Sequence, residues 1–177
     1  MESTKSLPWH EVEAAINKEI NWLQSVILES NYHGKKDYCS ICIFRRLAIL
    51  IISGKIRAKD IRSSVSLWGQ NNFPIDKKTH GGDWHHQLMN IIHNYFESLN
   101  YEVYVEPYLN LGRADLGVYK YRERNLFIEI GTISLPKLLH NLESMDGSDF
   151  LLVLDVNHAV EFSILKASYQ DSIKTIN

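Results

Sequence analysis

Two acidic residues stand in segments whose other residues are mostly apolar or small, as in β-strands. Asp115 lies in GRADLG (112–117), and Glu129 lies in FIEIG (127–131). If the two strands pair as a hairpin, both carboxylates approach each other on the same side of the sheet. Mg²⁺ relieves the repulsion between such carboxylates and keeps positions for water and phosphate. A bound ion of this kind activates water and neutralises charge at a phosphodiester. The alternative is that both acids are solvent-facing strand residues.

The elements around these acids change character near the middle of the chain. Apolar spacing predicts helices to about Ser30, over Tyr38–Ile52 and from Ala58 to about Leu67, so residues 1–70 are expected to form an all-helical unit. Residues 71–82, rich in glycine and polar residues, are the predicted linker. The core, 83–177, is predicted to contain the following elements: helix Asp83–Leu99, strands Tyr101–Leu109, Ala114–Tyr119 and Asn125–Gly131, helix Ser134–Ser144, strand Phe150–Val156 and an edge strand Val160–Leu165.

This α-β-β-β-α-β order, with the acids of GRAD (112–115) and IEIG (128–131), resembles the PD-(D/E)XK nuclease superfamily. That superfamily includes restriction endonucleases and archaeal Holliday-junction resolvases. An acid-x-Gly-Thr third strand is similar to that of predicted nucleases of archaeal viruses and plasmids. The resemblance covers about Gly82–Leu165 and leaves residues 1–79 outside.

The resemblance implies an α/β, restriction-endonuclease-like αβββαβ core with a mixed central sheet. It implies that Asp115 and Glu129 bind Mg²⁺ or Mn²⁺, with the Ile130 carbonyl as a third candidate ligand. The implied activity is metal-dependent DNA endonuclease cleavage of phosphodiester bonds, with branched, Holliday-junction-like DNA as one substrate. Relatives that cut such DNA commonly act as two-fold dimers, so a homodimer is expected.

The family pattern places a lysine two residues after the glutamate, where this chain has Gly131. In some members an equivalent amine comes from the next helix, and Lys137 in Ser134–Ser144 is the residue expected to assist the attacking water here. The alternative is a solvated surface lysine. Without an amine at the site, the protein would be a non-catalytic DNA-binding or assembly protein on a decayed nuclease fold.

Three further residues are candidates for the site. Glu106 belongs to one face of the first core strand and either joins the metal shell or points to water. His85 and His86 stand where many superfamily members place an acid on the opening helix, although packing is the commoner role of a helical histidine.

Cys39 and Cys42 have zinc-knuckle spacing but lack a second pair, so core thiols are expected and a zinc-stabilised interaction module is the alternative.

The charge of the chain is divided unevenly. The total is −2, but residues 1–79 carry +4 and residues 80–177 carry −6. Clustered Lys and Arg supply phosphate contacts, so DNA is the expected partner. The predicted contact residues are Lys35, Lys36, Arg45, Arg46, Lys55, Arg57, Lys59, Arg62 and Arg113. With no apolar run near ~20 residues and only two cysteines, no membrane partner and a cytoplasmic location are expected.

Overall fold

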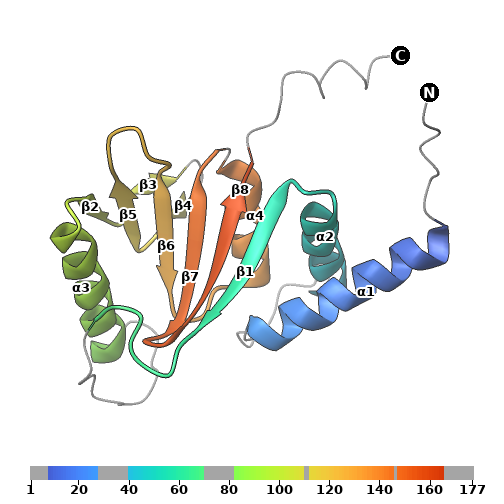
Figure 1. The fold of residues 1–177 in the computed structure, drawn as a ribbon, viewed down its shortest axis with the longest axis horizontal. Helices are drawn as coiled ribbons and strands as arrows, with labels where there is room; N and C mark the ends of the chain where they lie inside the picture. The colour runs from blue at the N-terminus through green and yellow to red at the C-terminus, as the bar shows by residue number, and fades with distance from the viewer. Residues whose placement is uncertain (1–7, 28–39, 70–81, 110–111, 146, 166–177) are drawn as a thin grey trace.

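A computed structural model describes residues 8–27, 40–69, 82–109, 112–145 and 147–165. Figure 1 shows a twisted sheet with α3 beside one end and α4, α2 and α1 toward the other. The helices are α1 (Trp9–Val26), α2 (Ser40–Ile52), α3 (Asp83–Ser98) and α4 (Leu135–Ser144). The strands are β1 (Ile56–Arg62), β2 (Glu102–Val105), β3 (Tyr108–Leu109), β4 (Gly112–Arg113), β5 (Leu116–Tyr119), β6 (Leu126–Ile130), β7 (Asp149–Asp155) and β8 (His158–Ile164). No helix within these ranges is both long and apolar enough to cross a membrane.

The described strands form a six-stranded mixed sheet, in the order β1-β8-β7-β6-β5-β2, and a short β3–β4 ribbon. β5 pairs antiparallel with β2 and with β6. β6 and β7 are parallel, because α4 carries the chain back across the sheet between them. The predicted mixed α/β class is therefore confirmed, and the chain passes from α3 through β2, β5 and β6 to α4 and β7.

Alternating residues of the central strands build a core on each face of the sheet. On one face Phe127 and Phe150 pack in the cluster that contains Leu138 of α4. On the other face Ile128 packs with Leu88 of α3. Each fully buried side chain of this size stabilises the fold by roughly 1.5–3 kcal/mol. The two helices are thereby fixed on opposite faces, with β5 and β6 between them.

The predicted helix from Ala58 to Leu67 is wrong, and the N-terminal 70 residues are not all-helical. Ile56–Arg62 is a strand whose residues all pair with β8, from Ile56↔Ile164 to Arg62↔His158. The segment IRAKDIR alternates in its first four residues, with Ile56 buried and Arg57 and Lys59 exposed, which is the period of a strand. Residues assigned to a separate helical unit therefore contribute a strand to the main sheet.

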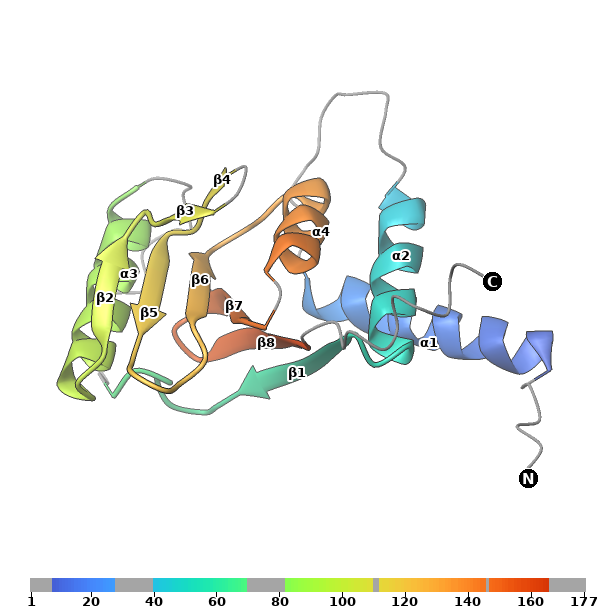
Figure 2. The same ribbon diagram turned by 90° about the horizontal axis from the view of Figure 1, so that it is seen from above.

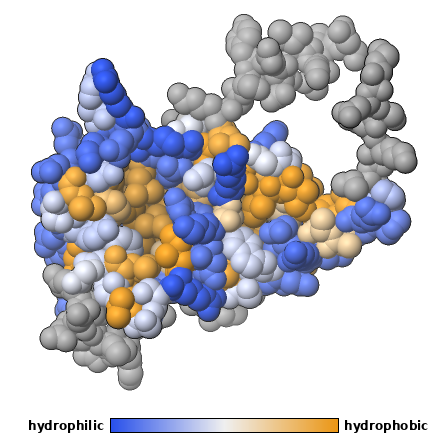
Figure 3. Space-filling view, viewed as in Figure 1, coloured by the Kyte–Doolittle hydropathy of each residue, from blue (hydrophilic) through white to orange (hydrophobic). Residues whose placement is uncertain are grey.

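Helices α1 and α2 lie beside α4, as Figure 2 shows. Leu23 of α1 and Phe44 of α2 are fully buried in the same cluster as Leu138. Ile41, Ile49 and Ile52 are exposed on α2, and Figure 3 shows hydrophobic residues gathered over this part of the surface.

Two other boundaries differ from prediction. The predicted edge strand Val160–Leu165 is β8, an internal strand, because β1 pairs along its other side. The predicted strand Tyr101–Leu109 divides into β2 and β3 at Glu106, whose φ of 48° lies in the left-handed region. The predicted linker 71–82 lies outside the described residues except for Gly82.

Candidate functional site

Asp115 and Glu129 lie at the same end of the β5–β6 pair, close enough for the Asp115 charge to raise the pKa of Glu129. The pairing runs Val118↔Leu126 and Leu116↔Ile128, and the Asp115 amide donates to the Ile128 carbonyl at 3.0 Å. The paired residues end at Leu116↔Ile128, so Asp115 and Glu129 each stand one residue beyond the last pair, with the Asp115 amide bonded to Ile128 rather than to Glu129. The predicted hairpin is confirmed, and it places both carboxylates where the strands end.

The Asp115 carboxylate is held by two donors. Its Oδ2 accepts a hydrogen bond from the Ile130 amide at 2.7 Å and lies 3.2 Å from His85 Nε2. Because a carboxylate only accepts hydrogen bonds, we assign the Nε2 hydrogen of His85 to this contact. Both contacts use the same oxygen of Asp115.

His85 reaches the site from the first turn of α3, which begins after Gly82. Its side chain is 15% exposed, and its Nδ1 is buried without a hydrogen-bond partner among the described residues. Neighbouring His86 is exposed and makes an edge-on ring contact with His85, at 5.8 Å between centroids. Of the two predicted histidines, it is His85 that the structure brings to Asp115.

Glu129 is a buried acid in the apolar interior, 7% exposed. Its Oε1 pairs with Lys137 Nζ, while its Oε2 is buried without a hydrogen-bond partner among the described residues. Burial raises the pKa of the Glu129 carboxyl, the Asp115 charge raises the pKa further, and the charges of Lys137 and His85 oppose these effects. The repulsion between the two carboxylates that the sequence predicts therefore acts on the pKa of Glu129.

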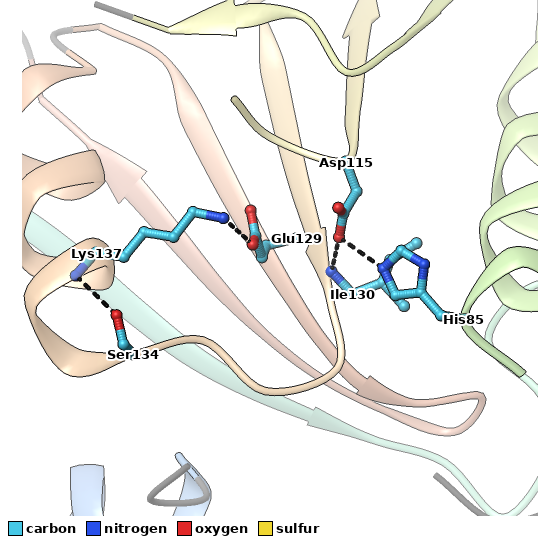
Figure 4. Close-up of polar contacts among 6 residues, drawn as sticks. All are labelled: His85, Asp115, Glu129, Ile130, Ser134 and Lys137. Atoms are coloured by element: carbon cyan, nitrogen blue, oxygen red, sulfur yellow. Dashed lines mark hydrogen bonds and ion pairs between the residues drawn. The ribbon is translucent and has the colours of Figure 1, made fainter. Parts of the chain in front are cut away.

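The start of α4 positions Lys137. Ser134 is the N-cap, and its hydroxyl accepts a hydrogen bond from the Lys137 amide at 3.4 Å, with Pro136 in the first turn. Figure 4 shows the Lys137 side chain reaching from α4 to Glu129 while His85 reaches Asp115 from the other side. The predicted amine on this helix therefore does contact the predicted metal-binding acid.

The backbone at Gly131 disfavours a lysine at the position where the family pattern has one. Its φ is +87°, and its amide donates to the Val153 carbonyl at 2.7 Å. A lysine in this left-handed conformation would cost roughly 1–2 kcal/mol. A Cβ there would also come within 3.7 Å of the Trp84 ring, which is ordinary contact. Sequence reasoning missed Trp84, which gave no signal beyond its place in an apolar helix face.

The donor set fits one kind of metal ion better than another. Within the described residues no group of three or more His, Cys, Asp or Glu side chains is arranged to hold a metal. Structural zinc requires four protein ligands, whereas Mg²⁺ commonly uses one or two carboxylates and retains several waters. Asp115 and Glu129, with the unpartnered Glu129 Oε2, fit the second pattern. For the Ile130 carbonyl, metal binding stays a prediction.

Neither Glu106 nor Cys42 brings its side chain to these acids in the described structure. Glu106 is an exposed residue that pairs with Arg113 at 2.8 Å, so it points to solvent. Cys42 is exposed on α2, so the prediction of a core thiol is wrong for this residue. Cys39 lies outside the described residues.

The structure pairs several predicted DNA-contact residues with carboxylates. Arg45 makes two hydrogen bonds to Glu13, at 2.9 and 3.0 Å. Three further arginines have one acidic partner each: Arg46 with Glu143, Arg62 with Asp60 and Arg113 with Glu106. Exposed pairs of this kind contribute about 0–1 kcal/mol, so a phosphate can compete for these arginines. Lys55, Arg57 and Lys59 are exposed at or beside β1, while Lys35 and Lys36 lie outside the described residues.

The sheet relates this basic edge to the acids. The register runs from Glu129 to Leu152, Val160 and then Asp60 of β1. Three strand spacings separate β6 from β1, which is about 14 Å. Asp60 shares the sheet face of Glu129, whereas the exposed Arg57 and Lys59 alternate with it and lie on the other face of this edge strand.

No family model, curated protein or solved structure matches this chain.

Proposed function

We propose that this protein is a metal-dependent DNA endonuclease of the PD-(D/E)XK type. The observation that carries the proposal is that Asp115 and Glu129 lie at the same end of the β5–β6 pair, where the Asp115 charge raises the pKa of Glu129, with Lys137 paired to the second acid. The passage of the chain through α3, β2, β5, β6, α4 and β7 supports it, because this order of elements is the one the resemblance implies.

Asp115 and Glu129 would hold Mg²⁺ or Mn²⁺, which supplies an activated water and neutralises charge on the scissile phosphate. The other residues of the site would hold the two carboxylates in the positions that the ion requires. The Ile130 amide and His85 fix the orientation of Asp115, and burial among apolar side chains fixes that of Glu129. Because Glu129 must be ionised to bind a cation, its raised pKa predicts weaker metal binding as the pH falls.

Lys137 has two roles in this proposal. Its ammonium group stabilises the ionised form of Glu129, and its exposure of 40% lets the same group turn toward a water or a phosphate oxygen. A positive charge placed beside the developing negative charge of the transition state lowers the barrier. Arg57, Lys59 and the arginines with exposed partners would bind the DNA backbone.

Cleavage assays on supercoiled, branched and single-stranded DNA test the proposal, with Mg²⁺, Mn²⁺ or EDTA. Wild-type protein is expected to cut in the presence of metal, and Glu129→Ala to cut about 100-fold more slowly or less. Glu123→Ala is the matched control, because Glu123 is an exposed acid in the turn between the far ends of β5 and β6. Equal cutting by wild type and Glu129→Ala, or DNA binding without cutting by either, contradicts the proposal.

A second candidate is a non-catalytic DNA-binding protein on the same framework. The pairing of Lys137 with Glu129 favours it, because the amine neutralises an acid that a cation would otherwise require. In that case DNA binding would be insensitive to EDTA and to Glu129→Ala. The homodimer implied by the resemblance is a further part of the proposal, tested by light scattering of the purified chain.

A further inference from the structure

The β3–β4 ribbon projects beside the Asp115–Glu129 site. It pairs Tyr108 with Arg113 and Leu109 with Gly112. Its base is tied to the site, because the Glu106 amide donates to the Asp115 carbonyl at 3.0 Å. Figure 2 shows the ribbon and α4 on either side of the end of β6.

The inner side of the ribbon is anchored in the core. Leu109 is 7% exposed and Ala114 is 1% exposed, and both belong to the cluster that contains Phe127 and Leu138. This cluster covers the sheet face toward which Glu129 and Lys137 point. The ribbon therefore lies on the face of the sheet that carries the acid and the amine.

The outer side of the ribbon presents an aromatic ring and a guanidinium group. Tyr108 is 82% exposed, and the Arg113 Cζ lies 5.3 Å from the centroid of its ring. A contact this close is a cation–π interaction. The pairing orders Arg113 over the ring and leaves most of the ring surface open, which no packing requirement of the described fold explains.

We infer that Tyr108 and Arg113 form a stacking platform for one unpaired base of a nucleic acid strand whose backbone passes Asp115 and Glu129. Arg113 precedes Asp115 by two residues, so their Cα atoms are at most about 7 Å apart. That span is at most about two steps of a strand at the duplex rise of about 3.4 Å per nucleotide, and fewer steps where the unpaired strand is extended. An aromatic ring stacks on any base, and an adjacent arginine attracts the phosphate. This inference rests on the proposed function, since it takes nucleic acid as the ligand of the site.

A second tyrosine gives a matched control. Tyr121 is 85% exposed, and Arg122 lies 5.1 Å from its ring centroid. It has the chemistry of Tyr108 but lies in the turn between β5 and β6, at the opposite end of β5 from Asp115. Truncating either ring removes a similar exposed surface, so only proximity to the site distinguishes the two.

The test is fluorescence anisotropy of the full chain in EDTA with labelled single-stranded DNA, single-stranded RNA of the same sequence and a blunt DNA duplex. Tyr108→Ala is expected to weaken single-strand binding about 10-fold and duplex binding less than about 2-fold, with Tyr108→Phe close to wild type. Tyr121→Ala is expected to bind all three probes as wild type does. A ring-dependent loss with only one of the two single strands identifies that strand as the ligand.

Equal single-strand binding by Tyr108→Ala and wild type, or an equal loss in Tyr121→Ala, overturns the inference. Absence of single-strand binding by wild type also overturns it. The cleavage assay separates the two claims. Metal-dependent cutting without a Tyr108 effect would reject the platform alone, whereas Tyr108-dependent binding without cutting supports the platform and rejects the nuclease.

Discussion

Replacing Lys137 by methionine removes the partner of a buried acid without disturbing the helix. Glu129 is 9% exposed in its side chain and Lys137 is 40% exposed, so the pair is asymmetric. Removing Lys137 leaves an acid that cannot reach water, whereas removing the Glu129 charge leaves an ammonium that can. Breaking a fully buried pair costs about 3–5 kcal/mol, and an exposed pair contributes about 0–1 kcal/mol. Discounted for the exposure of Lys137, the expected loss in Lys137→Met is about 2 kcal/mol near neutral pH.

The pH dependence of this loss follows from the Glu129 pKa. Because the pKa is raised in the folded protein, folding favours the protonated acid, and that contribution disappears as the pH rises through the folded pKa. Lys137 opposes the shift, so its removal raises the pKa further. The destabilisation of Lys137→Met should therefore be larger at about pH 8 than at about pH 5, because protonation of Glu129, which removes the buried charge, becomes more favourable as the pH falls.

Thermal unfolding by circular dichroism in EDTA measures this directly. A loss of 2 kcal/mol lowers the midpoint of a chain of this size by about 4–8 °C. We expect that fall for Lys137→Met at about pH 8, a fall below about 3 °C at about pH 5, and a change within about 1 kcal/mol for Glu129→Gln. An equal loss at both pH values, or a larger loss in Glu129→Gln than in Lys137→Met, would refute the reasoning.

Three further substitutions test other parts of the structure. Gly131→Lys should lower the free energy of unfolding, measured with urea, by roughly 1–2 kcal/mol because of the positive φ. The same substitution should not accelerate DNA cleavage. Faster cutting would show that Lys137 does not supply the amine. Arg124→Ala should lower the free energy of unfolding by about 2 kcal/mol, because Arg124 donates to the Ser148 and Ile164 carbonyls. Amide hydrogen exchange should become faster at the adjoining ends of β7 and β8. Unchanged exchange there would contradict this prediction. Arg113→Gln should reduce the slope of log affinity against log salt for DNA by about 1, and an unchanged slope would remove Arg113 from the backbone contacts.

The sequence predicted the core of the fold because its signals are local. The period of α3 and α4, the apolar run of β7 and the Ser134 cap each arise within a few neighbouring residues, and their elements lie within a residue or two of the predicted bounds. Strand β1 was not predicted, because IRAKDIR is short and gains its stability from pairing with β8, about a hundred residues later in the chain. Tertiary pairing of this kind overrides local propensity.

The site was predictable to a similar degree. Asp115 and Glu129 stand out in the sequence because acids are unusual inside strands, and their role as metal ligands stays a prediction. The predicted place of Lys137, one turn into α4, agrees with its contact to Glu129. The choice between His85 and His86 could not be made, because it depends on how α3 is rotated against the sheet. The ion pairs of Arg45 and Arg46 also could not be predicted from the sequence, because their acidic partners lie on other helices, α1 and α4.

We propose that Asp115 and Glu129 together hold a divalent cation, and metal binding tests this most directly. Electron paramagnetic resonance of Mn²⁺ titrated into the purified protein counts bound ions without relying on activity. We predict about one bound Mn²⁺ per chain, displaced by Mg²⁺ and lost in both Asp115→Asn and Glu129→Gln. Binding that is absent in the wild type, or unchanged in the two variants, would contradict it.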